Sequence, residues 1–133
     1  MNESLVVGLE NTRKIEVDEM RTISFMGEDS RVYSTPFVLH DVEVASHQLL
    51  SEYMDEDEVT VGISATINHM AATPLGMWVE IKVHIVGIDG RKIDLEFECK
   101  DAGDIIAKGK HSRFIVNKEK TAAQIKAKAG QYL

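Results

Sequence analysis

The chain has 133 residues, of which 44% are hydrophobic and 28% charged, and its net charge at pH 7 is −7. This size predicts one domain over residues 1–133, and the negative charge argues against a nucleic-acid partner. The single cysteine excludes an intramolecular disulfide, and no apolar run approaches the roughly 20 residues that span a bilayer. We therefore expect a soluble, cytoplasmic protein with no membrane partner.

The first 35 residues carry the weakest pattern. Residues 5–8 and 14–17 are apolar enough to predict short strands, and residues 21–34 predict a loop over the core. The pattern strengthens at residue 36. Apolar side chains recur there at steps of three or four and predict a helix over residues 36–54, with Pro36 in its first turn and Thr35 as its N-cap. The predicted apolar stripe is Val38, Val42, Ala45, Leu49 and Tyr53.

From residue 59 the period changes to two, which predicts antiparallel strands. Residues 59–69 place Val61, Ile63, Ala65, Ile67 and His69 on one side. Residues 77–88 and 92–100 alternate in the same way around a turn at Asp89-Gly90. Residues 105–116 form a fourth strand with looser alternation, and residues 122–130 predict a short helix.

A long helix followed by a meander of long strands predicts an α+β domain in which an antiparallel sheet wraps around the helix, the hotdog fold. A single such sheet leaves edge strands that need cover, so we expect at least a homodimer.

Three residues could carry chemistry, and each also has a structural explanation. His69 lies in phase with the apolar side of its strand, so it is either a satisfied core histidine or a catalytic one. Glu43 flanks the apolar stripe, where a carboxylate is either solvated or available as a general base. Thr35 is either a helix cap or a hydroxyl that holds a polar reactant at the helix N-terminus.

Three other features have competing interpretations. His40, Glu43 and His47 share one helical face at metal-ligand spacing, although surface histidines are the alternative and we expect no metal. Cys99 falls on the apolar side of its strand and predicts an inert core thiol. Residues 108–128 carry seven basic residues against one acidic, which indicates either a solvated strand and tail or a site for a phosphate-bearing ligand.

The residues from Tyr33 to Phe37 read Tyr-Ser-Thr-Pro-Phe, and His69 begins the run His-x-Ala-Ala-Thr-Pro-x-Gly that ends at Gly76. With Glu43 between them, these segments resemble the fluoroacetyl-CoA thioesterase family of hotdog proteins over roughly residues 15–120. The resemblance implies that Thr35, Glu43 and His69 form the catalytic group and that Gly62 and Arg113 line the acyl and thioester pocket. It also implies a dimer that binds CoA near its subunit interface.

The resemblance therefore implies an acyl-CoA thioesterase that uses no metal or organic cofactor and releases CoA. Glu43 would activate water or attack the thioester, His69 would carry the proton to the thiolate, and Thr35 would position Glu43 or the oxyanion. Fluoroacetate-specific members resemble one another in having phenylalanines where this chain has Met26 and Asp29, so we do not expect specificity for a fluorinated acyl group. We expect a short acyl chain that is weakly held. The alternatives are a non-catalytic acyl-CoA or acyl-carrier binding module and a metal-binding stress or sensor protein.

Overall fold

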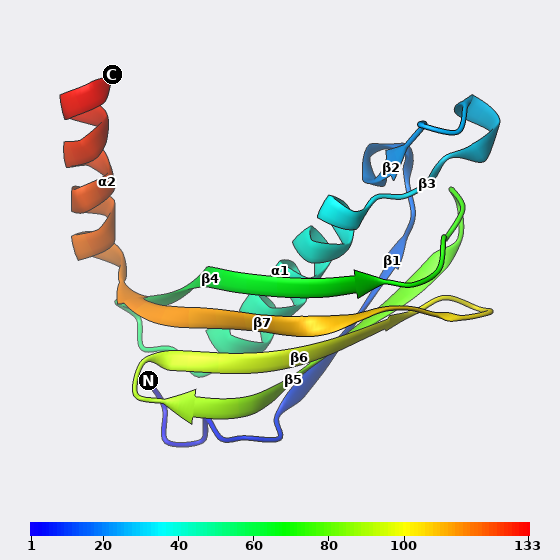
Figure 1. Cartoon of the computed structure of the whole chain (residues 1–133). Helices are drawn as coiled ribbons and strands as arrows, with labels where there is room; N and C mark the ends of the chain where they lie inside the picture. Colours follow the sequence, from blue (N-terminus) through cyan, green and yellow to red (C-terminus); the bar gives the residue numbers. More distant parts are fainter.

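The computed structural model describes residues 1–133 and shows one long helix, α1 (Thr35–Ser51), lying across a curved five-stranded sheet (Figure 1). The strand order is β1-β5-β6-β7-β4, and every neighbouring pair is antiparallel. Their bounds are β1 (Glu10–Glu16), β4 (Glu58–His69), β5 (Trp78–Asp89), β6 (Lys92–Lys100) and β7 (Ile105–Asn117). The predicted α+β arrangement, a helix wrapped by an antiparallel sheet, is confirmed.

The core lies between α1 and the sheet. The alternation predicted for the central hairpin is confirmed, because Val79, Ile81, Val83 and Ile85 of β5 and Ile93, Leu95, Phe97 and Cys99 of β6 are all buried. Burial raises the pKa of the Cys99 thiol to about 12, which keeps it protonated and unreactive. The hairpin turns at Gly90, whose φ of 61° is the left-handed conformation expected there.

Helix α1 differs from its prediction at both ends. Thr35 is the first helical residue and Ser34 is the N-cap, so the assignment of Thr35 as the cap was wrong. The helix ends at Ser51 rather than at residue 54, because the amides of Tyr53 and Met54 bond to carbonyls three residues back and tighten the last turn. Tyr53 therefore lies beyond the helix. The buried face includes two polar residues outside the predicted stripe, Asp41 and Ser46.

Strand β4 does not keep a single alternation. Its register with β7 shifts between Gly62 and Ser64, which marks a β-bulge at Ile63. Before the bulge the even-numbered Thr60 and Gly62 face the helix, whereas Ile63 is exposed. Beyond it Ile67 packs against the core, and His69 faces α1. The prediction that one set of odd residues faces inward was therefore wrong for the first half of the strand.

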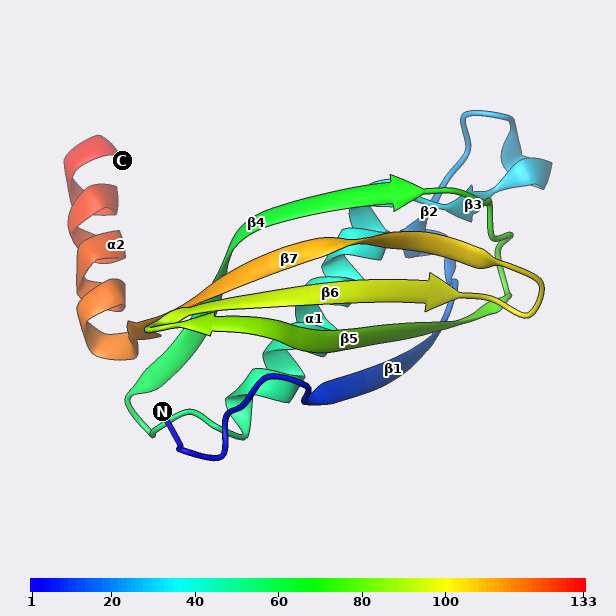
Figure 2. The ribbon, with the colours of Figure 1, turned by 60° about the horizontal axis from the view of Figure 1, so that its bottom comes forward.

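Residues 18–34, called the 18–34 segment below, rise above one end of the sheet (Figures 1 and 2). The segment contains η1 (Glu19–Arg21), β2 (Thr22–Ile23), η2 (Glu28–Ser30) and β3 (Val32–Tyr33), with β2 paired to β3. Residues 21–34 of this segment were predicted as a loop. The strand predicted at residues 5–8 is absent, whereas β1 begins earlier than the predicted residues 14–17.

The C-terminal helix α2 (Lys118–Tyr132) is longer than the predicted 122–130 and contains no buried residue. It stands away from the sheet at the end opposite the 18–34 segment (Figures 1 and 2). Neither α1 nor α2 is long and apolar enough to cross a membrane.

Candidate active site

The start of α1 meets the end of β4 through two side chains. The Thr35 hydroxyl oxygen lies 2.8 Å from Nδ1 of His69, a hydrogen bond between residues 34 positions apart. The bulge in β4 makes this contact possible, because it turns His69 toward the helix while Gly62 also faces it. Thr35 therefore orients an imidazole.

The His69 ring is poised to bind one more polar group. Its Nε2 atom is buried and has no hydrogen-bond partner. Burial lowers the pKa of His69 below the usual value for histidine, so the ring is neutral near pH 7. A neutral imidazole with one nitrogen engaged and the other free can transfer a proton to or from a bound ligand.

A cavity of about 280 Å³ adjoins this pair. Besides Thr35 and His69, it is lined by Ile23, Val32, Tyr33, Met70, Ala71 and Ala72. One wall comes from the 18–34 segment and the other from the residues that follow β4. Mostly apolar walls next to one hydroxyl and one imidazole suit a small apolar group attached to a polar centre.

Two turns further along α1, Glu43 is held by Arg113. Oε2 of Glu43 accepts a hydrogen bond of 3.1 Å from Nη1 of Arg113, and the glutamate side chain is 54% exposed while the arginine is buried. Gly62 lies directly beneath this carboxylate. A Cβ added at Gly62 would collide with Oε2 of Glu43. Glycine is therefore required for the carboxylate to occupy its place.

His111 belongs to this cluster although it was not predicted as a site residue. Arg113 donates through Nη1 to Nε2 of His111 (3.1 Å), and Nδ1 of His111 is bonded to the carbonyl oxygen of Ser64 (2.8 Å). Arg113 also donates to the side chain and carbonyl of Thr60. Burial lowers the pKa of His111, which keeps it neutral beside the arginine. Its position two residues before Arg113, on the same face of β7, was the available signal.

The five predicted site residues thus fall into two groups. Thr35 and His69 form one, and Glu43, Gly62 and Arg113 form the other. No hydrogen bond joins Glu43 to Thr35 or to His69. Because eight residues of α-helix rise about 12 Å, the two groups are separated by about that distance along the axis of α1.

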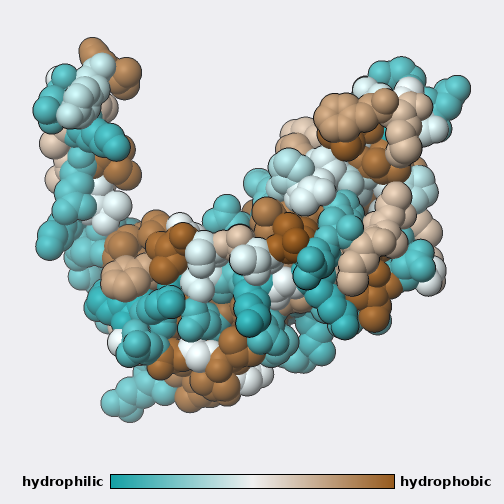
Figure 3. Space-filling view, in the orientation of Figure 1, coloured by the Kyte–Doolittle hydropathy of each residue, from teal (hydrophilic) through white to brown (hydrophobic).

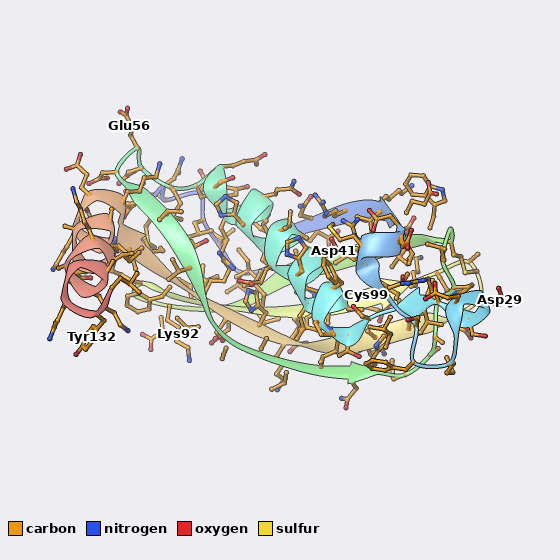
Figure 4. All side chains as sticks on the ribbon, turned by 90° about the horizontal axis from the view of Figure 1, so that it is seen from above. Asp29, Asp41, Glu56, Lys92, Cys99 and Tyr132 are labelled. Carbon is orange, nitrogen blue, oxygen red and sulfur yellow. The ribbon has the colours of Figure 1, made fainter.

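A buried ion pair, also missed from sequence, anchors the 18–34 segment to α1. Asp41 is fully buried and accepts two hydrogen bonds from Arg21, of 2.9 and 3.0 Å, and one of 2.5 Å from the Tyr33 hydroxyl. Burial and this carboxylate raise the pKa of Tyr33. Figure 4 shows Asp41 on α1 beside the base of the segment and Asp29 at its outer tip. The network fixes the cavity wall that carries Tyr33.

The residues after His69 hold the same segment from below. The amide of Tyr33 donates to the carbonyl of Thr73, and the amide of Leu75 donates to the carbonyl of Arg31. Thr73 is itself buried and donates to Asp101. Gly76 has a φ of 92° and turns the chain into β5. The Ala-Ala-Thr-Pro-x-Gly run thus binds the part of the 18–34 segment that forms one wall of the cavity.

The alternative metal site does not form as a group. No set of three His, Cys, Asp or Glu side chains in the structure could hold a metal ion. His40 packs edge-on against Phe37, Glu43 is bonded to Arg113, and His47 lines a different pocket near the end of α1.

Known proteins match this chain over most of its length. The model of the fluoroacetyl-CoA-specific thioesterase family matches residues 17–119. The fluoroacetyl-CoA thioesterase of Streptantibioticus cattleyicolor is 25% identical over 135 residues, which cover 96% of this chain and 97% of that enzyme. A variant of the fluoroacetyl-CoA-specific thioesterase FlK, solved with fluoroacetate and CoA, superposes with a TM-score of 0.80 at 25% identity, over 88% of this chain and 99% of that one. A thioesterase superfamily member from Thermus thermophilus has the same fold, with a TM-score of 0.89 at 22% identity over 98% and 97% of the two chains.

Proposed function

The chain belongs to the fluoroacetyl-CoA-specific thioesterase family and is a hotdog-fold thioester hydrolase, and we propose that it hydrolyses short-chain acyl-CoA thioesters with Thr35, Glu43 and His69. The observation that carries this proposal is the Thr35–His69 hydrogen bond at the mouth of the small cavity, with the Arg113-held carboxylate of Glu43 two turns further along the same helix. A solved variant of the related enzyme binds fluoroacetate and CoA, an acid and a thiol that correspond to the two products.

In this proposal the thioester lies in the gap between the two groups, with its acyl chain in the cavity. The Glu43 carboxylate either removes a proton from a water that attacks the carbonyl carbon or attacks that carbon itself. The C–S bond then breaks and the CoA thiolate leaves. If Glu43 itself attacks, water hydrolyses the resulting acyl–glutamyl anhydride in a second step. In both routes the neutral imidazole of His69 passes to the thiolate the proton that the water gives up, and the Thr35 hydroxyl holds the imidazole in position.

Arg113 and Gly62 act on Glu43 rather than directly on the acyl chain. The arginine cation stabilises the carboxylate and fixes one of its oxygens, which leaves the other free to face water or substrate. Gly62 provides the space that the carboxylate occupies. Both residues were expected to line the substrate pocket, and we propose that they position the reactive carboxylate there.

The cavity favours a short acyl group. Its volume of about 280 Å³ lies at the lower limit of ligand pockets, which begin at about 300 Å³. Met26 and Asp29 are exposed and do not line it, whereas Ile23 and Val32 do. We therefore propose acetyl to butyryl thioesters as substrates, with Ile23 and Val32 among the apolar contacts to the acyl chain.

We propose that the protein works as a homodimer formed along β4. That strand lies at the edge of the sheet and has no partner on its outer side. Val61 and Ile63 are exposed on it, at 37% and 51%. An unpaired edge with exposed apolar side chains is a surface that a second copy can cover by continuing the sheet.

The test is CoA release from acetyl-, propionyl-, butyryl- and longer acyl-CoA by the wild type and by Glu43→Gln. Replacing the carboxylate that Arg113 holds should lower turnover by at least about 10²-fold. The matched control is Glu52→Gln, an exposed glutamate just past the end of α1. Equal, negligible rates in wild type and E43Q, together with acyl-CoA binding to both by calorimetry, would favour the alternative of a non-catalytic acyl-CoA binding module.

A further inference from the structure

Helix α2 is largely uncovered within one copy of the chain. None of its fifteen residues is buried, yet Ala122, Ile125, Ala129 and Tyr132 recur at steps of three and four and form one apolar stripe. An isolated helix of this length is marginal in water, and helices normally gain their stability by packing such a stripe. Ile125 is 65% exposed. The stripe therefore lacks the surface that should cover it.

The position of α2 identifies that surface. The helix begins where Asn117 pairs with Glu58, at the start of β4, whereas the 18–34 segment lies at the other end of β4, beside His69. Figure 3 shows the hollow between these two projections. In Figure 4 Tyr132 on α2 and Asp29 on the segment lie at opposite ends of the molecule. The free edge of β4 runs between them.

A second copy paired antiparallel along that edge is rotated by 180°, so the start of its β4 lies against the end of the first copy's β4. The partner's α2 then arrives at the 18–34 segment of the first copy. The same operation brings the first copy's α2 to the partner's segment.

The two surfaces that meet are complementary. The 18–34 segment exposes Met20, Phe25 and Met26, with Phe25 90% exposed, and α2 offers its uncovered apolar stripe. Between residues 18 and 31 the segment carries four acidic and two basic side chains, whereas α2 carries four lysines and one glutamate. Apolar atoms and opposite net charges therefore face each other at both ends of the dimer.

We propose that α2 of each subunit packs on the 18–34 segment of the other and holds that segment over the acyl cavity, so that each active site is completed in trans. This inference rests on the proposed dimer along β4. The segment supplies Ile23, Val32 and Tyr33 to the cavity wall. Its outer part, with Phe25 and Met26, lies beyond the Arg21–Asp41 anchor and is exposed in one copy. We expect kcat/KM for acyl-CoA to fall about tenfold when α2 no longer covers that outer part.

Cross-linking tests the contact without reference to activity. The only native cysteine, Cys99, is fully buried and does not compete. The double variant Phe25→Cys with Ile125→Cys, treated with a short bismaleimide, should give a covalent dimer. The matched control pairs Phe25→Cys with Ala127→Cys, about 200° around the helix from Ile125, and should give much less. Equal yields for the two pairs, or cross-links confined to single chains, would overturn the proposal.

Subunit complementation tests the role in trans. Ile125→Asp places a carboxylate against the acidic segment and should lower kcat/KM about tenfold, whereas Ala127→Asp on the other face should not. In a mixed dimer of the I125D and E43Q chains, the site of the I125D chain keeps its own Glu43 and receives an intact α2 from the E43Q chain. The other site carries both defects. The activity of the mixed dimer should therefore recover to about half that of the wild type. Activity no higher than that of I125D alone would refute assembly in trans. If E43Q were itself fully active, the proposed function would fail while the cross-linking result stood.

Discussion

Substituting Gly62 by alanine tests whether the reaction depends on the position of the Glu43 carboxylate. In the structure an alanine Cβ at this position would collide with Oε2 of Glu43 and would lie 3.2 Å from Cε1 of His111. Hydrogen bonds to Arg113 and to the Ser64 carbonyl hold the imidazole, which has to shift by only a few tenths of an ångström. The carboxylate, at the end of a flexible side chain, must move further.

The size of the effect follows from that movement. Restoring an ordinary contact requires a shift of about 1 Å, and a misplacement of 1 Å in a reacting group costs up to about 10²-fold in rate. We therefore expect Gly62→Ala to lower kcat by about 100-fold, equivalent to about 2.7 kcal/mol of transition-state stabilisation. KM should change little, because the acyl cavity at Thr35 and His69 lies in the other group of site residues.

The assay is steady-state CoA release, with thermal unfolding measured in parallel. Gly87→Ala is the matched control, since its Cβ would meet Asp94 at 3.5 Å, an ordinary contact, in another strand of the same sheet. Both variants should unfold close to the wild-type temperature. A G62A enzyme with wild-type kcat would show that the position of this carboxylate does not limit the reaction, and the assigned role of Glu43 would fall with it.

Three further predictions follow from other contacts. Thr35→Val removes the hydroxyl that bonds His69 and should lower kcat/KM about tenfold, the worth of one hydrogen bond of about 1.4 kcal/mol, whereas Thr35→Ser should stay near wild type in the same assay. Asp41→Asn weakens the charged hydrogen bonds from Arg21 and should lower the free energy of unfolding by about 2 kcal/mol, measured by urea titration. An unchanged free energy of unfolding would mean that these hydrogen bonds make no net contribution to stability. Burial lowers the pKa of His69 and of His111 in the folded protein, so the unfolded chain binds more protons than the folded one at acid pH. The free energy of unfolding should therefore be highest above about pH 6.5 and decrease below it. The variant His69→Asn should flatten the slope of the unfolding free energy against pH.

The regular elements could be predicted because their patterns are local. The alternation in residues 77–88 and 92–100 is strict, and both strands were placed within a residue or two of their observed bounds. The bulge at Ile63 was not predicted, because it inserts one residue into β4 opposite β7 without changing the sequence pattern of apolar residues. The burial of Asp41 was not predicted either, because it depends on hydrogen bonds from Arg21 and Tyr33, which lie outside the helix.

The sequence by itself determined the fold class and, through the resemblance of its motifs, the family. It also supplied the five candidate site residues, since residue type and spacing are properties of the chain alone. Only the tertiary structure decided which of them meet: the hydroxyl of Thr35 bonds His69, and the carboxylate of Glu43 sits with Arg113 above Gly62. Those partners are 34 and 70 residues apart. Their distances depend on sheet register and on one bulge, which arise from hydrogen bonding between strands and from no local pattern.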